Sequence, residues 1–259
     1  MSKKTFIITG AYGTIGSAIA NILAKNHDHQ VICVGRDKIQ LDNVIKSIKG
    51  STNNEAVRGY AVDLSMKDNI YEFAKEINEP IDVLINNHAT APNQRQETSN
   101  GIELQWATNV LGYCWMMDAF HEHLKKAKHP RIVNVASYWA GDLDLNDLEF
   151  KQRKYNNNTA YRQAKQANRM LTSAYAQHFK DILVNVVHPG DASSKLSNSM
   201  GFGGHETPEQ SAKTPVYLAT SEEVNNITGK YFENCRQKTC PFMNETENVQ
   251  KLYEICKRY

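Results

Sequence analysis

Short apolar runs alternate with longer helical patterns along most of this 259-residue chain. The runs are apolar throughout rather than at every second residue, which is typical of strands covered on both faces of a parallel sheet. The alternation therefore predicts an α/β fold with a doubly wound, mostly parallel sheet of about seven strands and helices on both faces. We expect strands at 5–9, 31–35, 60–64, 81–86, 131–137 and 183–188, with 229–232 as a candidate seventh. We expect helices near 15–26, 37–49, 67–78, 98–127, 159–179 and 208–220.

No repeat or linker interrupts this alternation, so residues 1–259 are predicted to form a single domain. The polar stretch 151–159 lies inside the alternation and is interpreted as an inserted loop. Residues 191–210 follow the last major strand and are rich in Gly and Ser, which favours a lid-like segment over a ligand site. Residues 233–259 are expected to form a C-terminal tail.

Composition argues against several classes of protein. The formal net charge is +2, which gives no reason to expect a nucleic acid or a membrane surface as a partner. No apolar run reaches the roughly 18 residues of a membrane span, so we expect a cytoplasmic protein. Five Cys, an odd number, are present without paired zinc-binding spacing, which favours reduced thiols and no metal site.

A glycine-rich turn, "TGAYGTIG" at 9–16, follows the first expected strand. Ligands of such sheets bind beyond the carboxyl ends of the strands, where the amino end of a helix favours a phosphate. The turn therefore predicts a dinucleotide site, with Gly10, Tyr12, Gly13, Thr14, Ile15 and Gly16 as its candidate contacts.

Arg36 follows the second expected strand, at the place where an acidic residue would bind the ribose hydroxyl of NAD. An arginine can pair with a 2′-phosphate in forked geometry, so we expect NADP(H) as cofactor, with NAD(H) as the alternative. The competing interpretation is a solvated Arg36 that Asp37 partly neutralises.

Further motifs follow the later strands: "DL" at 63–64, "NNHA" at 86–89, "TNVLG" at 108–112, "NVAS" at 134–137, "YRQAK" at 161–165 and "HPG" at 188–190. In this order the motifs resemble those of the short-chain dehydrogenase/reductase family over nearly the full chain, which implies a Rossmann-type fold. The long segment between Ser137 and Tyr161 is most similar to the retinol-dehydrogenase-like branch. The resemblance implies an oxidoreductase that acts on a small lipophilic alcohol, aldehyde or ketone.

The resemblance also implies a catalytic tetrad of Asn109, Ser137, Tyr161 and Lys165. Tyr161 would be the general acid and base, Ser137 would bind the substrate oxygen, Lys165 would also hold the ribose, and Asn109 would fix a water. A phenol has a pKa near 10, so work near pH 7 needs a shift of about 3 units, or about 4 kcal/mol. An ammonium about 4 Å away at an effective dielectric near 20 supplies about 4 kcal/mol, so we expect Lys165 to lower the pKa of Tyr161.

Two other Tyr-x-x-x-Lys pairs, Tyr71 with Lys75 and Tyr253 with Lys257, share this spacing. Neither follows a strand that ends in serine, so both pairs are interpreted as structural. By resemblance, the remaining cofactor contacts are Asp63, Leu64, Asn86, Asn87, Pro189, Gly190 and Ser194, in addition to Tyr161 and Lys165.

Two positions depart from the family pattern. Thr14 stands where the branch has glycine, and His88 replaces a small residue close to the cofactor, where a larger side chain would narrow the site. These changes keep open an alternative function, a catalytically weak or inactive Rossmann-fold protein retained for cofactor binding or assembly. An extended-family epimerase is a third interpretation, but the segment after His188 is too short for its substrate domain. By resemblance we expect a homodimer that pairs through 98–127, whose apolar residues are otherwise simply buried.

Overall fold

One sheet organises the molecule, whose computed structural model describes residues 3–259. Its strands are β1 (Lys4–Thr9), β2 (His29–Gly35), β3 (Val57–Ala61), β4 (Val83–Asn86), β5 (Arg131–Val135), β6 (Leu183–Val187), β7 (Tyr231–Glu233) and β8 (Arg236–Lys238). Within the described residues the strand order is β3-β2-β1-β4-β5-β6-β7-β8, and all neighbours are parallel except β7 and β8. The predicted α/β, doubly wound and mostly parallel sheet is confirmed.

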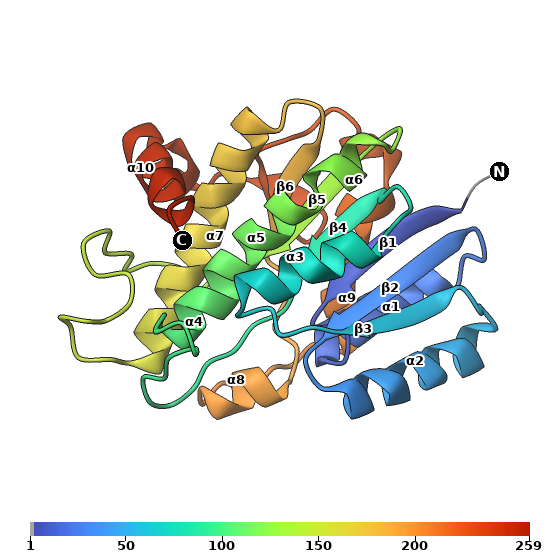
Figure 1. The fold of residues 1–259 in the computed structure, drawn as a ribbon, viewed down its shortest axis with the longest axis horizontal. Coiled ribbons are helices and arrows are strands. Elements are labelled where there is room, and N and C mark those ends of the chain that lie inside the picture. Colours follow the sequence, from blue (N-terminus) through green and yellow to red (C-terminus); the bar gives the residue numbers. More distant parts are fainter. Residues whose placement is uncertain (1–2) are drawn as a thin grey trace.

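Helices cover both faces of the sheet (Figure 1). They are α1 (Thr14–Ala24), α2 (Lys38–Thr52), α3 (Lys67–Glu76), α4 (Leu104–Trp106), α5 (Gly112–Ala119), α6 (His121–Lys125), α7 (Asn157–His178), α8 (Lys195–Ser199), α9 (Pro208–Thr220) and α10 (Thr246–Cys256). In Figure 1, α3, α5 and α7 lie in front of the sheet. On the opposite face, α1 contacts both α2 and α9.

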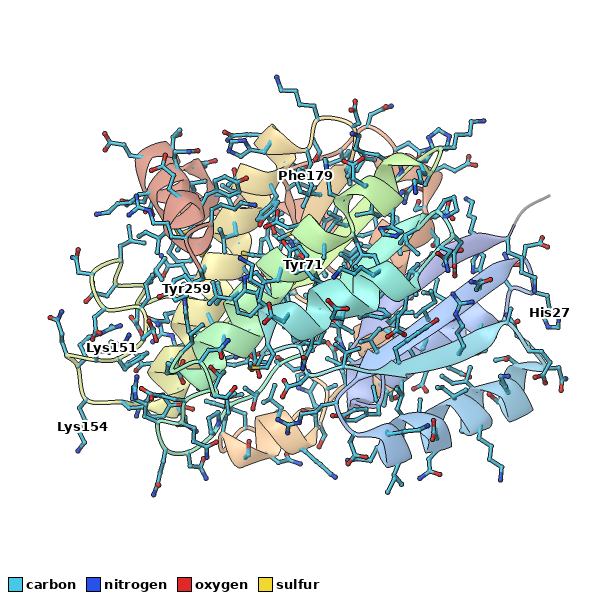
Figure 2. All side chains as sticks on the ribbon, in the orientation of Figure 1. His27, Tyr71, Lys151, Lys154, Phe179 and Tyr259 are labelled. Atoms are coloured by element: carbon cyan, nitrogen blue, oxygen red, sulfur yellow. The ribbon has the colours of Figure 1, made fainter. Side chains whose placement is uncertain are left out.

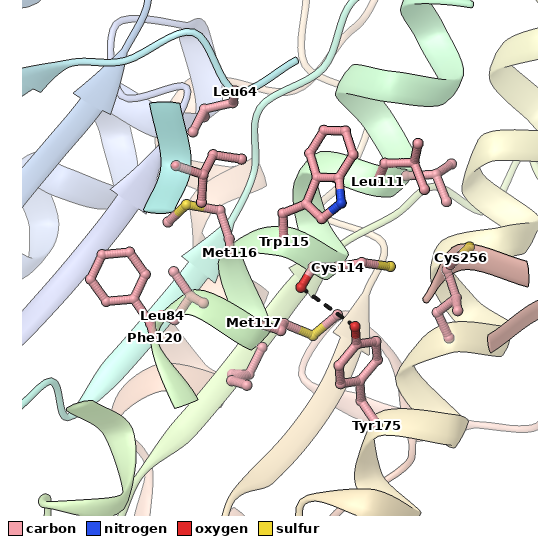
Figure 3. Packing of buried hydrophobic residues seen from close by; sticks show 14 of the residues in the cluster. Leu64, Leu84, Leu111, Cys114, Trp115, Met116, Met117, Phe120, Tyr175 and Cys256 are labelled. Carbon is pink, nitrogen blue, oxygen red and sulfur yellow. Dashed lines mark hydrogen bonds between the residues drawn. The ribbon is translucent and has the colours of Figure 1, made fainter. Parts of the chain in front are cut away.

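Two apolar layers hold the helices to the sheet. Successive residues of a strand point to opposite faces, so Ile7 of β1 belongs to the layer under α3, α5 and α7, whereas Ile8 belongs to the other layer. Figure 3 shows part of the first layer, where Phe120 packs near Leu84 of β4. Most apolar residues of 98–127 are buried within the chain, so burial in the core explains why this segment is apolar.

Residues 98–127 form three helices rather than the single helix predicted. The Glu103 carboxylate accepts hydrogen bonds from the backbone amides of Gln105 and Trp106, so it caps α4 and helical structure begins only after it. A π-helical turn, Ala107–Leu111, then joins α4 to α5 and carries most of the "TNVLG" motif. Such turns are frequent at functional sites.

Two strands also differ from expectation. β3 begins and ends three residues earlier than predicted, because its last residue pairs with Gly35 at the end of β2. Val62–Leu64 therefore leave the sheet. The sheet has eight strands within the described residues, rather than about seven, because Asn234 and Cys235 adopt positive φ and turn the chain back into β8. The β8 sequence is short and polar, so it lacks the apolar run that marks the other strands.

The predicted lid and tail both contain regular structure. A bridge between Ala192 and Glu206 closes the base of the lid, and α8 lies between these residues. In the tail, α10 packs on α7 and buries Leu252 and Cys256. Among residues 3–259, none of the helices combines the length and the hydropathy that a bilayer-spanning segment needs.

Candidate active site

Two adjoining cavities open at the carboxyl edge of the sheet. The first, of about 620 Å³, is lined by residues that follow β1 to β4 and by α8. The second, of about 390 Å³, is lined by residues that follow β5 and β6 and by the lid. Ile15, Ser194 and Leu196 line both cavities, so the two meet at these residues. Of the predicted contacts near the lid, Ser194 lines both cavities, and Pro189 and Gly190 line the second.

The glycine-rich turn after β1 forms one wall of the first cavity. Gly10 has a φ of +65°, a left-handed conformation that glycine adopts readily, and the Gly13 N–H donates to the Gly10 carbonyl over 3.0 Å. A Cβ on Gly16 would lie 2.2 Å from that carbonyl oxygen, so only glycine lets α1 approach the turn this closely. The spacing of the three glycines thus closes the turn, and α1 begins directly after Gly13. All six predicted contacts of the turn line the cavity: Gly10, Tyr12, Gly13, Thr14, Ile15 and Gly16.

Arg36 is exposed and lines the rim of the first cavity. The neighbouring Asp37 caps α2, because its carboxylate accepts hydrogen bonds from the backbone and side-chain amides of Gln40. None of the ion pairs within residues 3–259 involves Arg36. The guanidinium is therefore available to a ligand. The predicted contacts Asp63 and Leu64 line the same cavity.

The two asparagines after β4 lie in different environments. Asn87 lines the first cavity, and its Nδ2 donates to the carbonyl of Thr9 over 3.0 Å. Asn86 is fully buried in the sheet, its Nδ2 donates to Oδ1 of Asn134 over 3.0 Å, and it lines neither cavity. Successive residues of an extended chain point in opposite directions, so the Asn86 side chain faces away from the cavity that Asn87 lines. A cofactor contact of Asn86 stays a prediction.

His88 joins three parts of the fold. Its Nδ1 lies 2.8 Å from Oγ1 of Thr9, and its Nε2 lies 2.8 Å from the carbonyl oxygen of Thr108 in the π turn. Because a carbonyl only accepts, Nε2 carries the proton and donates it. Burial lowers the pKa of His88 to about 3, so the imidazole is neutral at physiological pH. His88 contributes to the wall of the first cavity, but both ring nitrogens are engaged with the protein.

Asn109 fixes the loop after β4 to the π turn. Its Nδ2 donates to the Thr90 carbonyl over 2.8 Å, and its Oδ1 accepts the Thr90 N–H over 2.8 Å. The second proton of Nδ2 is donated to Gln105 Oε1 over 3.2 Å. Asn109 is fully buried and lines neither cavity. Its side chain is therefore bound to the protein, and the role of Asn109 in fixing a water of the proton relay stays a prediction.

Tyr161, Ser137 and Lys165 converge at the second cavity. Tyr161 lies in the second turn of α7, Ser137 follows β5, and both line this cavity. Lys165, one turn further along α7, is buried, and its Nζ donates to the carbonyl of Val135 over 3.0 Å. The same Nζ lies 5.4 Å from the centroid of the Tyr161 ring. The structure thus brings together three of the four residues predicted to be catalytic.

The pKa of Tyr161 shifts in the direction opposite to the one predicted. Burial raises it above the usual value of a phenol, a hydrogen bond with the Ser137 side chain lowers it, and the Asp191 carboxylate raises it further. Burial also lowers the pKa of Lys165 to about 7, so its amine is only partly protonated near neutral pH. The prediction treated Lys165 as a full charge, whereas desolvation disfavours the charged forms of both groups.

The other two Tyr-x-x-x-Lys pairs line neither cavity. On α3, which carries Tyr71 (Figure 2), Lys75 pairs with Glu72 over 2.6 Å. Directly after α10, Lys257 pairs with Asp118 over 2.6 Å. Both lysines therefore act in surface ion pairs, in agreement with the structural interpretation.

Comparison with known sequences places these features in a family. A family model described as short chain dehydrogenase matches residues 4–201. The chain belongs to the short-chain dehydrogenase family. Retinol dehydrogenase 13 of Mus musculus is 33% identical over 96% of this chain and 81% of its own length. Retinol dehydrogenase 14 of Homo sapiens is 29% identical over 98% of this chain and 85% of its own length.

Solved structures agree with this short-chain dehydrogenase fold. An uncharacterized protein from Mycobacterium paratuberculosis superposes with a TM-score of 0.82 at 22% identity, over 99% of this chain and 93% of that protein. Salutaridine reductase from Papaver somniferum superposes with a TM-score of 0.72 at 19% identity, over 90% of this chain and 100% of that protein. The predicted resemblance to the retinol-dehydrogenase-like branch is confirmed by the sequence relatives.

Several residues of this short-chain dehydrogenase site were not predicted. Thr90 is bound through its backbone to Asn109, and nothing in its side chain signals that role. Lys195 and Leu196 of α8 line the first cavity, and their position directly after Ser194 in the lid was the available signal.

Proposed function

We propose that the chain is an NADP(H)-dependent oxidoreductase that moves a hydride between the nicotinamide and the carbonyl or alcohol carbon of a small lipophilic substrate. The observation that carries this proposal is that Tyr161 and Ser137 line the second cavity, which meets the first, dinucleotide-sized cavity. Two relatives named retinol dehydrogenases support a carbonyl or alcohol substrate.

The first cavity fits a dinucleotide in shape and in donor groups. Its volume of about 620 Å³ is in the usual range for such ligands, about 300–1,000 Å³. A Cβ on Gly10 or Gly16 would clash with the backbone, so these glycines allow the tight turn at the helix amino terminus, where a pyrophosphate would bind. Asn87, Asp63 and Ser194 would hold the rest of the cofactor, which supplies or accepts the hydride when bound.

In this proposal Tyr161 provides the proton. Its raised pKa keeps the phenol protonated, so in the reducing direction it can donate to the substrate oxygen while the carbon takes the hydride. The Ser137 hydroxyl oxygen accepts the Trp139 N–H over 3.1 Å. Its own proton is shared with the Tyr161 oxygen, and it would turn to the substrate oxygen when the substrate binds. Lys165, when protonated, would contact the ribose and favour the phenolate that remains.

Arg36 supports the preference for NADP(H). The Arg36→Ala variant is expected to lose about tenfold or more in kcat/KM with NADPH, because a charge-assisted hydrogen bond contributes about 1.5–3 kcal/mol. Its kcat/KM with NADH should stay within about twofold. Lys38→Ala is the control, since Lys38 is an exposed cation two residues away that pairs with Asp42 over 2.7 Å. Equal use of NADPH and NADH by the unmutated protein would contradict this assignment.

A panel of lipophilic aldehydes and ketones, followed by the nicotinamide absorbance with NADPH and with NADH, tests the activity itself. We expect NADPH oxidation with at least one aromatic or aliphatic aldehyde. Binding of NADPH by calorimetry without turnover across the panel would favour the alternative, an inactive protein retained for cofactor binding. Because both His88 nitrogens bind protein groups, this residue supplies no specific support for that alternative.

A homodimer and a cytoplasmic location remain predictions. The apolar residues of 98–127 are largely buried in the single chain, so we propose that a dimer would use another surface. Light scattering of the purified protein and cell fractionation test the two predictions separately.

A further inference from the structure

One acidic side chain, Asp191, lines the substrate cavity. The walls of this cavity are mostly aromatic or apolar, but Asp191, directly after the Pro-Gly turn, is the only carboxylate among its lining residues, and no lysine or arginine lines it. The Asp191 side chain keeps 41% of its surface exposed. No protein group within residues 3–259 donates a hydrogen bond to its carboxylate, whose contact with His188 is 3.9 Å long. A carboxylate in that position is available to a ligand.

The carboxylate lines the same cavity as Tyr161 and Ser137. Its negative charge contributes to the raised pKa of Tyr161. It also raises the pKa of His188, against the larger lowering by burial, and the Nδ1 of this histidine is buried without a hydrogen-bond partner. Two other carboxylates face His188, but each is occupied: Glu206 accepts from the Ser211 hydroxyl over 3.0 Å, and Glu233 accepts from Tyr231. Arg169, whose charge lowers the pKa of His188, donates to the carbonyl of Ser137 and to Tyr231. Asp191 alone therefore lacks a hydrogen-bond donor.

Much of the wall of this cavity is aromatic. The Trp139 ring lies 6.2 Å from the Tyr161 ring, and the Phe202 ring of the lid meets Trp139 edge-on at 4.6 Å. Phe202 and Tyr138 keep 44% and 54% of their surfaces exposed. Flat apolar ligands pack well against such rings. The lid that carries Phe202 also carries α8, which lines both cavities (Figure 1).

We propose that the preferred substrate is amphipathic: an aromatic or flat apolar body that packs against Trp139 and Phe202, and a hydroxyl or protonated amine beside the reacting carbon that donates to Asp191. The inference rests on the proposed carbonyl and alcohol chemistry of Tyr161 and adds the polar half of the substrate. An aldehyde with only a hydrocarbon body would pack against these aromatic rings. Once bound, it would shield the Asp191 carboxylate from water without donating a hydrogen bond to it.

Three phenyl ketones that share the same aromatic part test the proposal: 2-amino-1-phenylethanone, 2-hydroxy-1-phenylethanone and 1-phenylpropan-1-one. On the carbon next to the carbonyl they carry an ammonium, a hydroxyl or a methyl group, respectively. At pH 6 with NADPH, kcat/KM is expected to be about tenfold or more higher for the amine or the alcohol than for the methyl compound. The ratio of amine to alcohol then identifies which donor the site prefers. Equal values for all three ketones would overturn the proposal.

Asp191→Asn keeps the shape of the side chain and removes its charge. This variant should bring kcat/KM for the preferred donor compound to within about threefold of that for the methyl compound. An effect of the lost charge on the pKa of Tyr161 changes kcat/KM for all three ketones alike and cancels in this ratio. Glu209→Gln is the matched control, because it removes an exposed carboxylate of α9 that lines neither cavity. Phe202→Ala should lower kcat/KM for all three ketones alike. If Asp191→Asn lowers kcat/KM for all three ketones by the same factor, the proposal is wrong.

Calorimetric binding of the same three ketones to the NADPH-loaded protein gives a readout that needs no turnover. A donor preference in binding that Asp191→Asn abolishes would support this inference even if no ketone is reduced, and the failure would then belong to the proposed reaction. Equal binding of the three compounds would overturn the inference alone.

Discussion

At the scale of one residue, the buried amine of Lys165 in the candidate active site lowers the stability of the folded protein. Its Nζ is buried and has one hydrogen-bond acceptor, the carbonyl of Val135, which also accepts from the Tyr113 hydroxyl. Burial lowers the pKa of Lys165 to about 7, below the ordinary value of 10.5 that it regains on unfolding. The folded protein therefore holds an amine that the unfolded chain protonates more readily.

Lys165→Met is expected to stabilise the cofactor-free protein. The unfavourable burial of the charge is complete below about pH 7 and declines as the pH rises toward 10.5. The variant should therefore gain on the order of 2–4 kcal/mol in unfolding free energy at pH 6, and less at pH 9. The carbonyl of Val135 keeps its bond from Tyr113.

Urea unfolding at pH 6 and pH 9 measures the effect of Lys165→Met. Lys75→Met is the control, because Lys75 is exposed on α3 and its loss should change stability by less than about 1 kcal/mol. A larger gain at pH 9 than at pH 6 would contradict the burial of the amine.

At the same scale, some side chains of the site could be predicted from sequence and others could not. Ser137, Tyr161 and Lys165 belong to motifs placed after strands, so sequence order was enough to bring them together. The environment of His88 depends on Thr9, 79 residues away, and on Thr108, 20 residues away. No local pattern encodes such contacts, and for the same reason burial reversed the expected pKa shift of Tyr161.

At the scale of elements, the parallel strands were predictable because each is a continuous apolar run. The limits of several elements depend instead on partners elsewhere: β3 ends where its register with β2 ends, and α4 begins where Glu103 caps it. The glycine-rich turn is a local feature whose geometry follows directly from the spacing of its glycines.

Gly16→Ala is expected to damage the turn, because the new Cβ would lie 2.2 Å from the backbone carbonyl oxygen of Gly10, which has no side-chain freedom to move. We expect a loss of about 1–3 kcal/mol in stability from this overpacking. NADPH should also bind at least about tenfold more weakly, since the displaced helix terminus no longer matches the pyrophosphate.

Gly50→Ala is the matched control within α2. A Cβ on Gly50 meets nothing within 4 Å, so the helix should gain about 0.5–1 kcal/mol. Thermal melting and calorimetric NADPH titration of both variants measure these effects. Unchanged NADPH affinity in Gly16→Ala would contradict the role given to the turn.

At the scale of the whole molecule, the tail is part of the core. Leu252 of α10 is fully buried in the same apolar layer as Ile7 of β1. We propose that residues 1–259 unfold as one domain, because this layer joins the amino-terminal strand to the carboxyl-terminal helix.

Leu252→Ala should destabilise the entire chain by about 2–5 kcal/mol, the usual effect of removing a buried leucine side chain. Far-ultraviolet circular dichroism and tryptophan fluorescence should report a single, coincident transition shifted to lower urea. A separate early transition for the variant, with the main transition unmoved, would show that α10 is an independent appendage.

Isotope transfer from labelled NADPH tests directly whether the protein moves a hydride with Tyr161 as the proton donor. With NADPH that carries deuterium at the reactive C4 position and a substrate ketone, we expect mass spectrometry to find one deuterium at the carbinol carbon of the product. Tyr161→Phe should slow this transfer by about 100-fold or more, while NADPH affinity and the activity of the Tyr71→Phe control stay within about threefold. Transfer at an unchanged rate in Tyr161→Phe would contradict the assignment of Tyr161 as the proton donor.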